Sequence, residues 1–156
     1  MLVFRGGGYK TCQGSGIGAA AWLAEHGVVG VEVEYRTTGQ SPDSVTWERE
    51  QRTGFYPGED SAMRDAERAA FIVRELSLDS SLRADVGLPC RLCPQRIGAI
   101  GFSAGGHLAS MLATPVPSCD AYEGYRMPCR SEWRPDRLVL CYPVISLADE
   151  VWQHAP

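Results

Sequence analysis

One serine in the sequence has the spacing of a nucleophile held on a tight turn. Gly101, Ser103 and Gly105 match the pattern G-x-S-x-G, in which the serine joins a strand to a helix. Glycines two positions before and after the serine relieve collisions between side chains and backbone at that strained turn. The turn lifts the hydroxyl above the sheet, and the helix N-terminus stabilises negative charge on a substrate. We therefore predict that Ser103 is the nucleophile of an acyl-transfer site; the alternative is a strand-helix turn without chemistry.

A glycine run near the N-terminus could supply the donors that such a nucleophile needs. Gly6, Gly7 and Gly8 follow the short apolar run Leu2–Phe4. Acyl transfer needs backbone N–H groups aimed at the developing oxyanion, and glycine lets the backbone approach a substrate closely. The run fits the glycine-rich loop of serine enzymes, with Arg5 at the position that histidine often occupies. The alternative interpretation is a flexible N-terminal loop, because chain ends are commonly disordered.

The strands that must position these residues are predicted from apolar runs. Four such runs are typical of buried strands: residues 2–4, 28–35, 97–102 and 138–142. Three polar stretches rich in proline and glycine predict loops: 37–58, 77–95 and 115–135. Strands that alternate with helices imply right-handed crossovers and an α/β fold, with a parallel sheet of about four strands and helices on both faces.

A helix is predicted after each of the first three strands. Ser15 is expected to cap the first helix and Gly27 to end it; Asp60 or Ser61 caps the second, and the third follows Ser103. Their apolar sides are predicted to contain Ala19, Trp22, Leu23 and His26 in the first, Met63, Ala66, Ala70, Val73 and Leu76 in the second, and Ala104, Leu108, Met111 and Leu112 in the third.

Composition narrows the class of protein. With 44% hydrophobic and 22% charged residues, the 156 residues predict one globular domain, 1–156. The net charge of -4 and the scattered arginines give no reason to expect nucleic acid as a partner. No apolar stretch is long enough to cross a bilayer, and no signal peptide is recognisable, so the cytoplasm is the default expectation.

The cysteines do not predict a metal centre. Cys90 and Cys93 have metal-ligand or redox spacing, but zinc takes four ligands, and no second close pair accompanies them. Cys119 and Cys129 bracket a polar loop and could form a disulfide in an oxidising compartment. We expect neither a metal nor a cofactor.

Several short motifs follow one another in the order of a known family. They are Gly6–Tyr9, Ala21–Leu23 before Gly27, Tyr35–Arg36, Asp65–Ala69, Arg74, Gly101–Ala109 and Tyr142–Ser146. In this order they resemble the hormone-sensitive-lipase-like and acetyl-xylan/feruloyl esterase (BD-FAE-like) branch of the α/β-hydrolases. The resemblance covers nearly the whole chain. It implies a partial α/β-hydrolase fold whose sheet has the strand order second, first, third, fourth.

The resemblance also implies an activity and a set of site residues. Its members cleave short-chain acyl or acetyl esters of small molecules or carbohydrates. Carried over by motif, Ser103 is the nucleophile, and the oxyanion hole is formed by Gly6, Gly7, Gly8 and the N–H of Ala104.

The acid and the base of such a site are harder to find. In this fold they follow the serine, but only His107 and His154 do so as histidines. His107 lies one helical turn beyond Ser103 and is expected to point into packing, and no strand separates His154 from Glu150. We therefore expect a chain that is truncated at both ends relative to the family, and that is inactive or weakly active by itself.

Two other functions stay open at this point. Gly14, Gly16 and Ala19 fit the dinucleotide fingerprint G-x-G-x-x-A, with Glu32 downstream, which would indicate a short-chain oxidoreductase. Against it, the fingerprint does not follow the first strand directly, and no tyrosine precedes a lysine by four positions because Lys10 is the only lysine. The second possibility is a non-catalytic hydrolase-like remnant or interaction domain.

Overall fold

The computed structural model describes residues 1–37, 59–88, 90–114 and 134–145. In chain order its elements are β1 (Leu2–Phe4), α1 (Ala19–Glu25), β2 (Val31–Glu32), α3 (Glu59–Leu78), α4 (Ser80–Asp85), β3 (Gly98–Phe102), α5 (Ala104–Ala113) and β4 (Arg137–Cys141). The strands form one parallel sheet in the order β2-β1-β3-β4. The predicted four-stranded α/β architecture and its strand order are both confirmed.

Strand β1 lies inside the sheet, between β2 and β3. Leu2, Val3 and Phe4 are all fully buried, as expected for a short apolar strand covered on both faces. Phe4 is in register with Gly101 of β3. Because the two strands are parallel, the chain leaves both of them at the same edge of the sheet, so the glycine run after Phe4 emerges beside the turn that contains Ser103.

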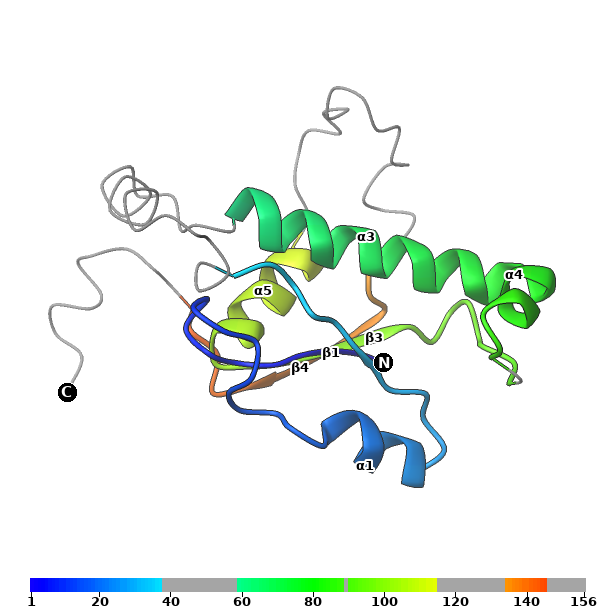
Figure 1. Ribbon diagram of the computed structural model, residues 1–156, viewed down its shortest axis with the longest axis horizontal. Helices are drawn as coiled ribbons and strands as arrows, with labels where there is room; N and C mark the ends of the chain where they lie inside the picture. Colours follow the sequence, from blue (N-terminus) through cyan, green and yellow to red (C-terminus); the bar gives the residue numbers. More distant parts are fainter. Residues whose placement is uncertain (38–58, 89, 115–133, 146–156) are drawn as a thin grey trace, which may run out of the picture.

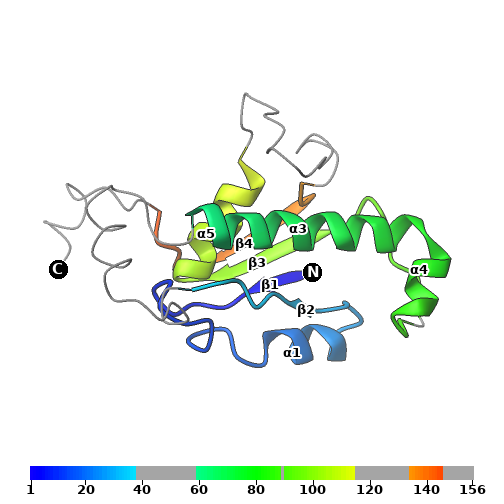
Figure 2. The ribbon, with the colours of Figure 1, turned by 45° about the horizontal axis from the view of Figure 1, so that its top comes forward.

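The helices cover the two faces of the sheet unequally. Helices α3 and α5 lie on one face, and α1 lies on the other (Figure 1; Figure 2 shows the same layers after a rotation). On α3 most of the predicted apolar side is confirmed, since Met63, Ala66, Ala70 and Val73 are buried. The fifth predicted residue, Leu76, is half-buried. Most of the buried helical side chains therefore come from α3 and α5, and the core lies between these helices and the sheet.

The first helix differs from the prediction. It begins at Ala19 after Gly18, whose φ of 81° is left-handed, and no side chain caps it. Ser15 does not cap the helix; its carbonyl instead accepts the N–H of Gly6 at 2.9 Å. Of the predicted apolar side, only Leu23 is buried, whereas Trp22 is 58% exposed. The apolar side chains of α1 recur at helical spacing, but most of them have no neighbouring surface that buries them.

Further boundaries differ from the expectation. Helix α3 begins at Glu59, so Asp60 and Ser61 lie within the helix and neither caps it. Strand β2 contains only Val31–Glu32, not residues 28–35, because its partner β1 is three residues long and ends where the glycine run turns away. Helix α4 lies within the predicted loop 77–95. Asp79 caps it by accepting the N–H groups of Ser81 and Leu82, which is a cap signal that the sequence contains. Nearly all of the predicted loops 37–58 and 115–135, and both Cys119 and Cys129, lie outside the described residues.

Candidate active site

Ser103 stands on a strained turn between β3 and α5. Its φ of 52° and ψ of -118° confirm the strain that the G-x-S-x-G pattern predicts. Its N–H donates to the carbonyl of Cys141 at 3.0 Å, and its own carbonyl accepts the N–H of Val144 at 3.2 Å. The end of β4 and the residues after it therefore hold the turn from one side.

The two glycines of the motif are required by close backbone contacts. A Cβ atom on Gly105 would lie within 3.0 Å of the carbonyl oxygens of Phe4 and Arg5, where the glycine run begins. A Cβ atom on Gly101 would collide in the same way with the backbone of Gly105. Since real side chains do not make such contacts, the two glycines let α5 begin directly against the end of β1.

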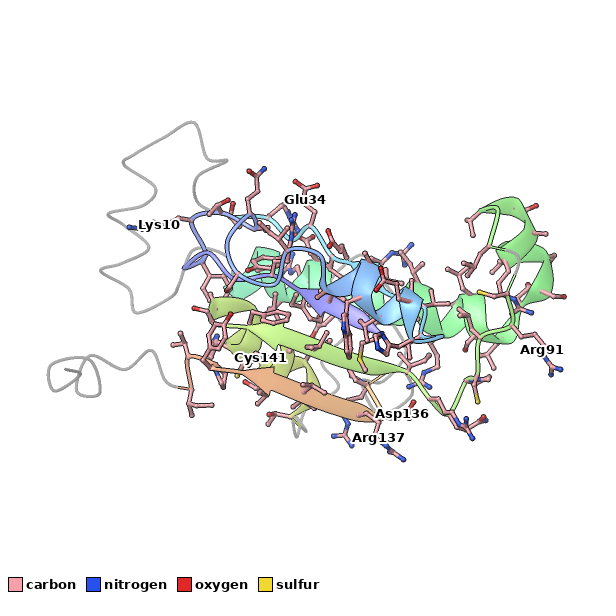
Figure 3. All side chains as sticks on the ribbon, turned by 90° about the horizontal axis from the view of Figure 1, so that it is seen from below. Lys10, Glu34, Arg91, Asp136, Arg137 and Cys141 are labelled. Atoms are coloured by element: carbon pink, nitrogen blue, oxygen red, sulfur yellow. The ribbon has the colours of Figure 1, made fainter. Side chains whose placement is uncertain are left out.

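The glycine run lies beside Ser103 at the carboxyl edge of the sheet. A Cβ atom on Gly6 would be 3.1 Å from the Cβ of Ser103 and 2.8 Å from the carbonyl oxygen of Phe102. Figure 3 shows Lys10, just after the run, at the same end of the sheet as Cys141, whereas Asp136 is at the opposite end. Ligands of open α/β sheets bind at this edge.

The hydrogen bonds of the glycine run show which of the predicted N–H donors already have an acceptor. Gly6 donates its N–H to the carbonyl of Ser15 at 2.9 Å, so this N–H is already engaged, contrary to the prediction for Gly6. Within the described part of the chain, the N–H groups of Gly7 and Gly8 donate to no backbone carbonyl. Ala104 is the first residue of α5, so its N–H has no intrahelical acceptor. Among the described residues, the N–H groups of Gly7, Gly8 and Ala104 therefore have no backbone acceptor, whereas that of Gly6 has one.

Two tyrosines and a histidine surround the loop. The hydroxyl of Tyr9 lies 2.8 Å from Nδ1 of His107, and the hydroxyl of Tyr35 donates to the carbonyl of Arg5 at 2.6 Å. Burial lowers the pKa of His107 below its usual range and raises that of Tyr35 well above its own. His107 points into packing as predicted, but sequence reasoning missed its partner; the position of Tyr9 directly after the glycines was the available signal.

A general base next to Ser103 is not found among residues 1–37, 59–88, 90–114 and 134–145. There, no histidine or carboxylate hydrogen-bonds to the serine hydroxyl. His107 is engaged with Tyr9, and His26 stacks on Trp22 at a ring-centroid distance of 4.1 Å. His154 lies outside the described residues. The described part of the site thus brings together the serine and the glycine loop.

The stretch that resembles a dinucleotide fingerprint has a packing role. Gly14 donates its N–H to the carbonyl of Gly6 at 3.0 Å. Gly16 has a φ of 94°, and a Cβ atom there would collide with the ring of Phe102. These glycines therefore fold the chain against the glycine run and against the strand that precedes Ser103.

Other kinds of site find no support in the described residues. These residues contain no group of three or more His, Cys, Asp or Glu side chains placed to hold a metal ion. Cys90 and Cys93 are free thiols. None of the described helices has the length and apolarity needed to cross a membrane.

Comparisons with known proteins agree with this geometry. No family model matches the chain. A curated acetylxylan esterase of Xylanibacter ruminicola is 29% identical over 148 residues, which are 94% of this chain and 22% of that protein. The chain therefore spans about a fifth of the length of this relative.

Two solved structures share the fold. The first is MGS-M1, an α/β-hydrolase enzyme from a Medee basin deep-sea metagenome library: the TM-score is 0.58 and the identity 26%, with 96% of this chain and 46% of that one covered. The second is a sugar hydrolase (YeeB) from Lactococcus lactis, with a TM-score of 0.57, 18% identity, and coverage of 94% and 45%.

The strained serine turn and these likenesses favour the hydrolase interpretation over the short-chain oxidoreductase interpretation. The chain has the α/β-hydrolase fold, and its sequence is similar to that of an acetylxylan esterase.

Proposed function

We propose that this chain carries the nucleophile and the oxyanion hole of a serine ester hydrolase that acts on short-chain acyl or acetyl esters of small molecules or carbohydrates. The observation that carries the proposal is the position of Ser103. This serine stands on a strained turn, and its Cβ lies next to Gly6 of the glycine run. The acetylxylan esterase relative supports an acetylated carbohydrate as the substrate class.

In the proposed mechanism, backbone N–H groups bind the ester oxygen and the serine hydroxyl attacks the ester carbon. The ester carbonyl oxygen accepts hydrogen bonds from Gly7 or Gly8 and from Ala104, and the hydroxyl oxygen of Ser103 attacks the carbonyl carbon. The serine proton passes to a base, and the alcohol leaves with a proton. Water then cleaves the acyl-serine, releasing the acid and restoring the hydroxyl. Each oxyanion donor of this kind typically contributes about 10²- to 10³-fold to the rate.

By itself the described site supplies only part of this catalysis. A serine without a hydrogen-bonded base keeps its proton, and such a hydroxyl is a poor nucleophile at neutral pH. Serine hydrolases that lose the base lose about 10⁴- to 10⁶-fold in rate, and the oxyanion hole and substrate binding provide what remains. We therefore expect turnover barely above background for this chain alone.

The test is chemical rescue with imidazole as an added base. Hydrolysis of p-nitrophenyl acetate is followed with increasing imidazole for the wild-type chain, Ser103→Ala and the matched control Ser80→Ala on the distant helix α4. We expect imidazole to raise the rate above the Ser103→Ala blank in the wild type and in Ser80→Ala. Equal rates for the wild type and Ser103→Ala at every imidazole concentration would contradict the proposal.

A non-catalytic hydrolase-like domain is the second candidate. The observation that favours it is the engagement of His107 by Tyr9, together with the lack of a base beside Ser103 among the described residues. It predicts that Ser103 gains no acyl group even with imidazole. Mass spectrometry of the acylated chain separates the two candidates.

A further inference from the structure

We propose that Tyr9 and His107 form a latch that fixes the glycine loop on helix α5, and that both are positioning residues for the oxyanion hole. The inference rests on the proposed function, because it assigns this contact a task in holding the donors. The latch is defined as the Tyr9 hydroxyl and the His107 imidazole.

The first support is the geometry of the pair. The Tyr9 hydroxyl lies 2.8 Å from His107 Nδ1, and the two residues are 98 positions apart in the sequence. The two rings also meet edge to face, with centroids 6.0 Å apart and planes at 88°. Tyr9 is buried although it directly follows three glycines, and its φ of 57° is unusual for a side chain of this size. Such a conformation persists only where the surroundings hold it.

The second support is an anchor at the other end of the loop. The hydroxyl of Tyr35 donates to the carbonyl of Arg5, the residue before the glycines. The ring of Tyr35 also packs edge-on against Tyr9, with centroids 6.0 Å apart. The loop is thus held before its first glycine by Tyr35 and after its last glycine by the latch.

A run of three glycines needs such anchors. Glycine loses more conformational freedom on ordering than any other residue, so Gly6–Gly8 by themselves would sample many backbone conformations. Oxyanion donors act only when they are held near the position of the developing charge, and small displacements reduce the rate strongly. His107 lies on α5, which begins with Ala104, so the latch connects the loop to the helix that provides the other donor.

The test is a double-mutant cycle read by amide hydrogen exchange. Tyr9→Phe removes only the hydroxyl, His107→Gln removes the imidazole, and the double variant removes both. His26→Gln, at an exposed position that ends helix α1, is the matched control. We expect each single variant to raise the exchange rates of the Lys10 and Thr11 amides, which donate to the carbonyl of Gly7, about five- to tenfold, while amides within α5 keep their rates.

The cycle also has a second, chemical readout. The double variant should exchange no faster than either single variant, because both remove the same contact. Reaction of Ser103 with a fluorophosphonate in the presence of imidazole should slow by a similar factor in Tyr9→Phe and stay unchanged in His26→Gln. Additive effects in the cycle, or loop exchange unchanged by Tyr9→Phe, would overturn the latch.

Failure of the proposed function is distinguishable from failure of the latch. If the wild-type chain gains no phosphonate on Ser103, the proposed function is wrong, whereas the exchange data still decide whether the pair holds the loop. If His107→Gln loses its circular-dichroism signal, Tyr9→Phe alone decides, because it keeps the aromatic ring.

Discussion

The two faces of the sheet differ in how many helical side chains are buried against them. On the α3 and α5 face, helical side chains such as Val73 and Leu112 are buried against the strands. On the α1 face, Leu23 is the buried residue of the helix, and Trp22 and Ile17 are exposed. Helix α5 begins directly after Ser103. The geometry of the proposed site therefore depends on the face covered by α3 and α5, and little on α1.

The largest effect is expected where backbone meets backbone at the serine turn. Gly105→Val would place side-chain atoms against the carbonyls of Phe4 and Arg5, so we expect a loss of more than about 4 kcal/mol in the free energy of unfolding. Gly87→Ala is the control, because a Cβ there meets no atom within 4 Å and only its φ of 67° is unfavourable. Urea unfolding should show a loss of about 1 kcal/mol for this control. Equal losses in the two variants would contradict the steric explanation.

Cavity formation compares the two faces directly. Leu112→Ala on α5 removes a fully buried side chain, and we expect a loss of about 3 kcal/mol. Trp22→Ala on α1 removes a larger but mostly exposed side chain, and we expect less than about 1 kcal/mol. Thermal and urea unfolding of both variants measure the difference. A larger loss for Trp22→Ala would show that the α1 face contributes more than its packing indicates.

Arg74 of α3 connects the helix to the chain segments that lead into β3 and β4. Its guanidinium donates to the carbonyls of Pro94 and Arg134, and it pairs with Asp136 at 3.3 Å. Asp136 in turn accepts the N–H of Ile97 at 2.8 Å. We expect Arg74→Met to cost about 2 kcal/mol in urea unfolding, because two partly buried carbonyls lose their donor.

Arg68→Met provides the control for Arg74→Met on the same helix. The Arg68 guanidinium is exposed and lies 5.4 Å from the centre of the Phe71 ring. We expect a cost below about 1 kcal/mol for its removal. If the two variants lose equal stability, the contacts of Arg74 do not hold the sheet as described.

The smallest effect concerns pH. Burial lowers the pKa of His107 from its ordinary value of 6.5. Below pH 6.5 the unfolded chain binds a proton on this histidine that the folded chain does not yet bind. The free energy of unfolding therefore keeps the whole contribution of His107 above about pH 6.5 and loses it as the pH falls toward the lowered pKa. The urea midpoint should therefore fall less between pH 7.5 and pH 5.5 in His107→Gln than in the wild type. An equal fall in both chains would contradict the shift.

The sequence predicted those parts of the molecule that local patterns determine. The apolar side of α3 and the strained turn at Ser103 follow from periodicity and from the G-x-S-x-G pattern. The strand order depended also on the resemblance to a known family. The exposure of Trp22 could not be predicted, because periodicity marks an apolar side but not whether a neighbour covers it.

The site shows the same division between local and distant contacts. The glycine run was recognisable from its composition, and the structure places it beside Ser103. The engagement of the Gly6 N–H by Ser15, and the contact of Tyr9 with His107, join residues that are distant in the sequence. No local pattern encodes such pairs, so only the folded chain shows which N–H groups are available and which histidine is engaged.

The most direct test of the central claim is to map the adduct that a fluorophosphonate forms with the wild-type chain. Intact-mass spectrometry gives the rate, and peptide mapping gives the residue. The account predicts one adduct, on Ser103, that forms slowly, accelerates with imidazole and is lost in Ser103→Ala. An adduct on another residue, or no adduct with imidazole, would contradict the assignment of Ser103. Fast labelling without imidazole would show instead that a base within the chain already reaches it.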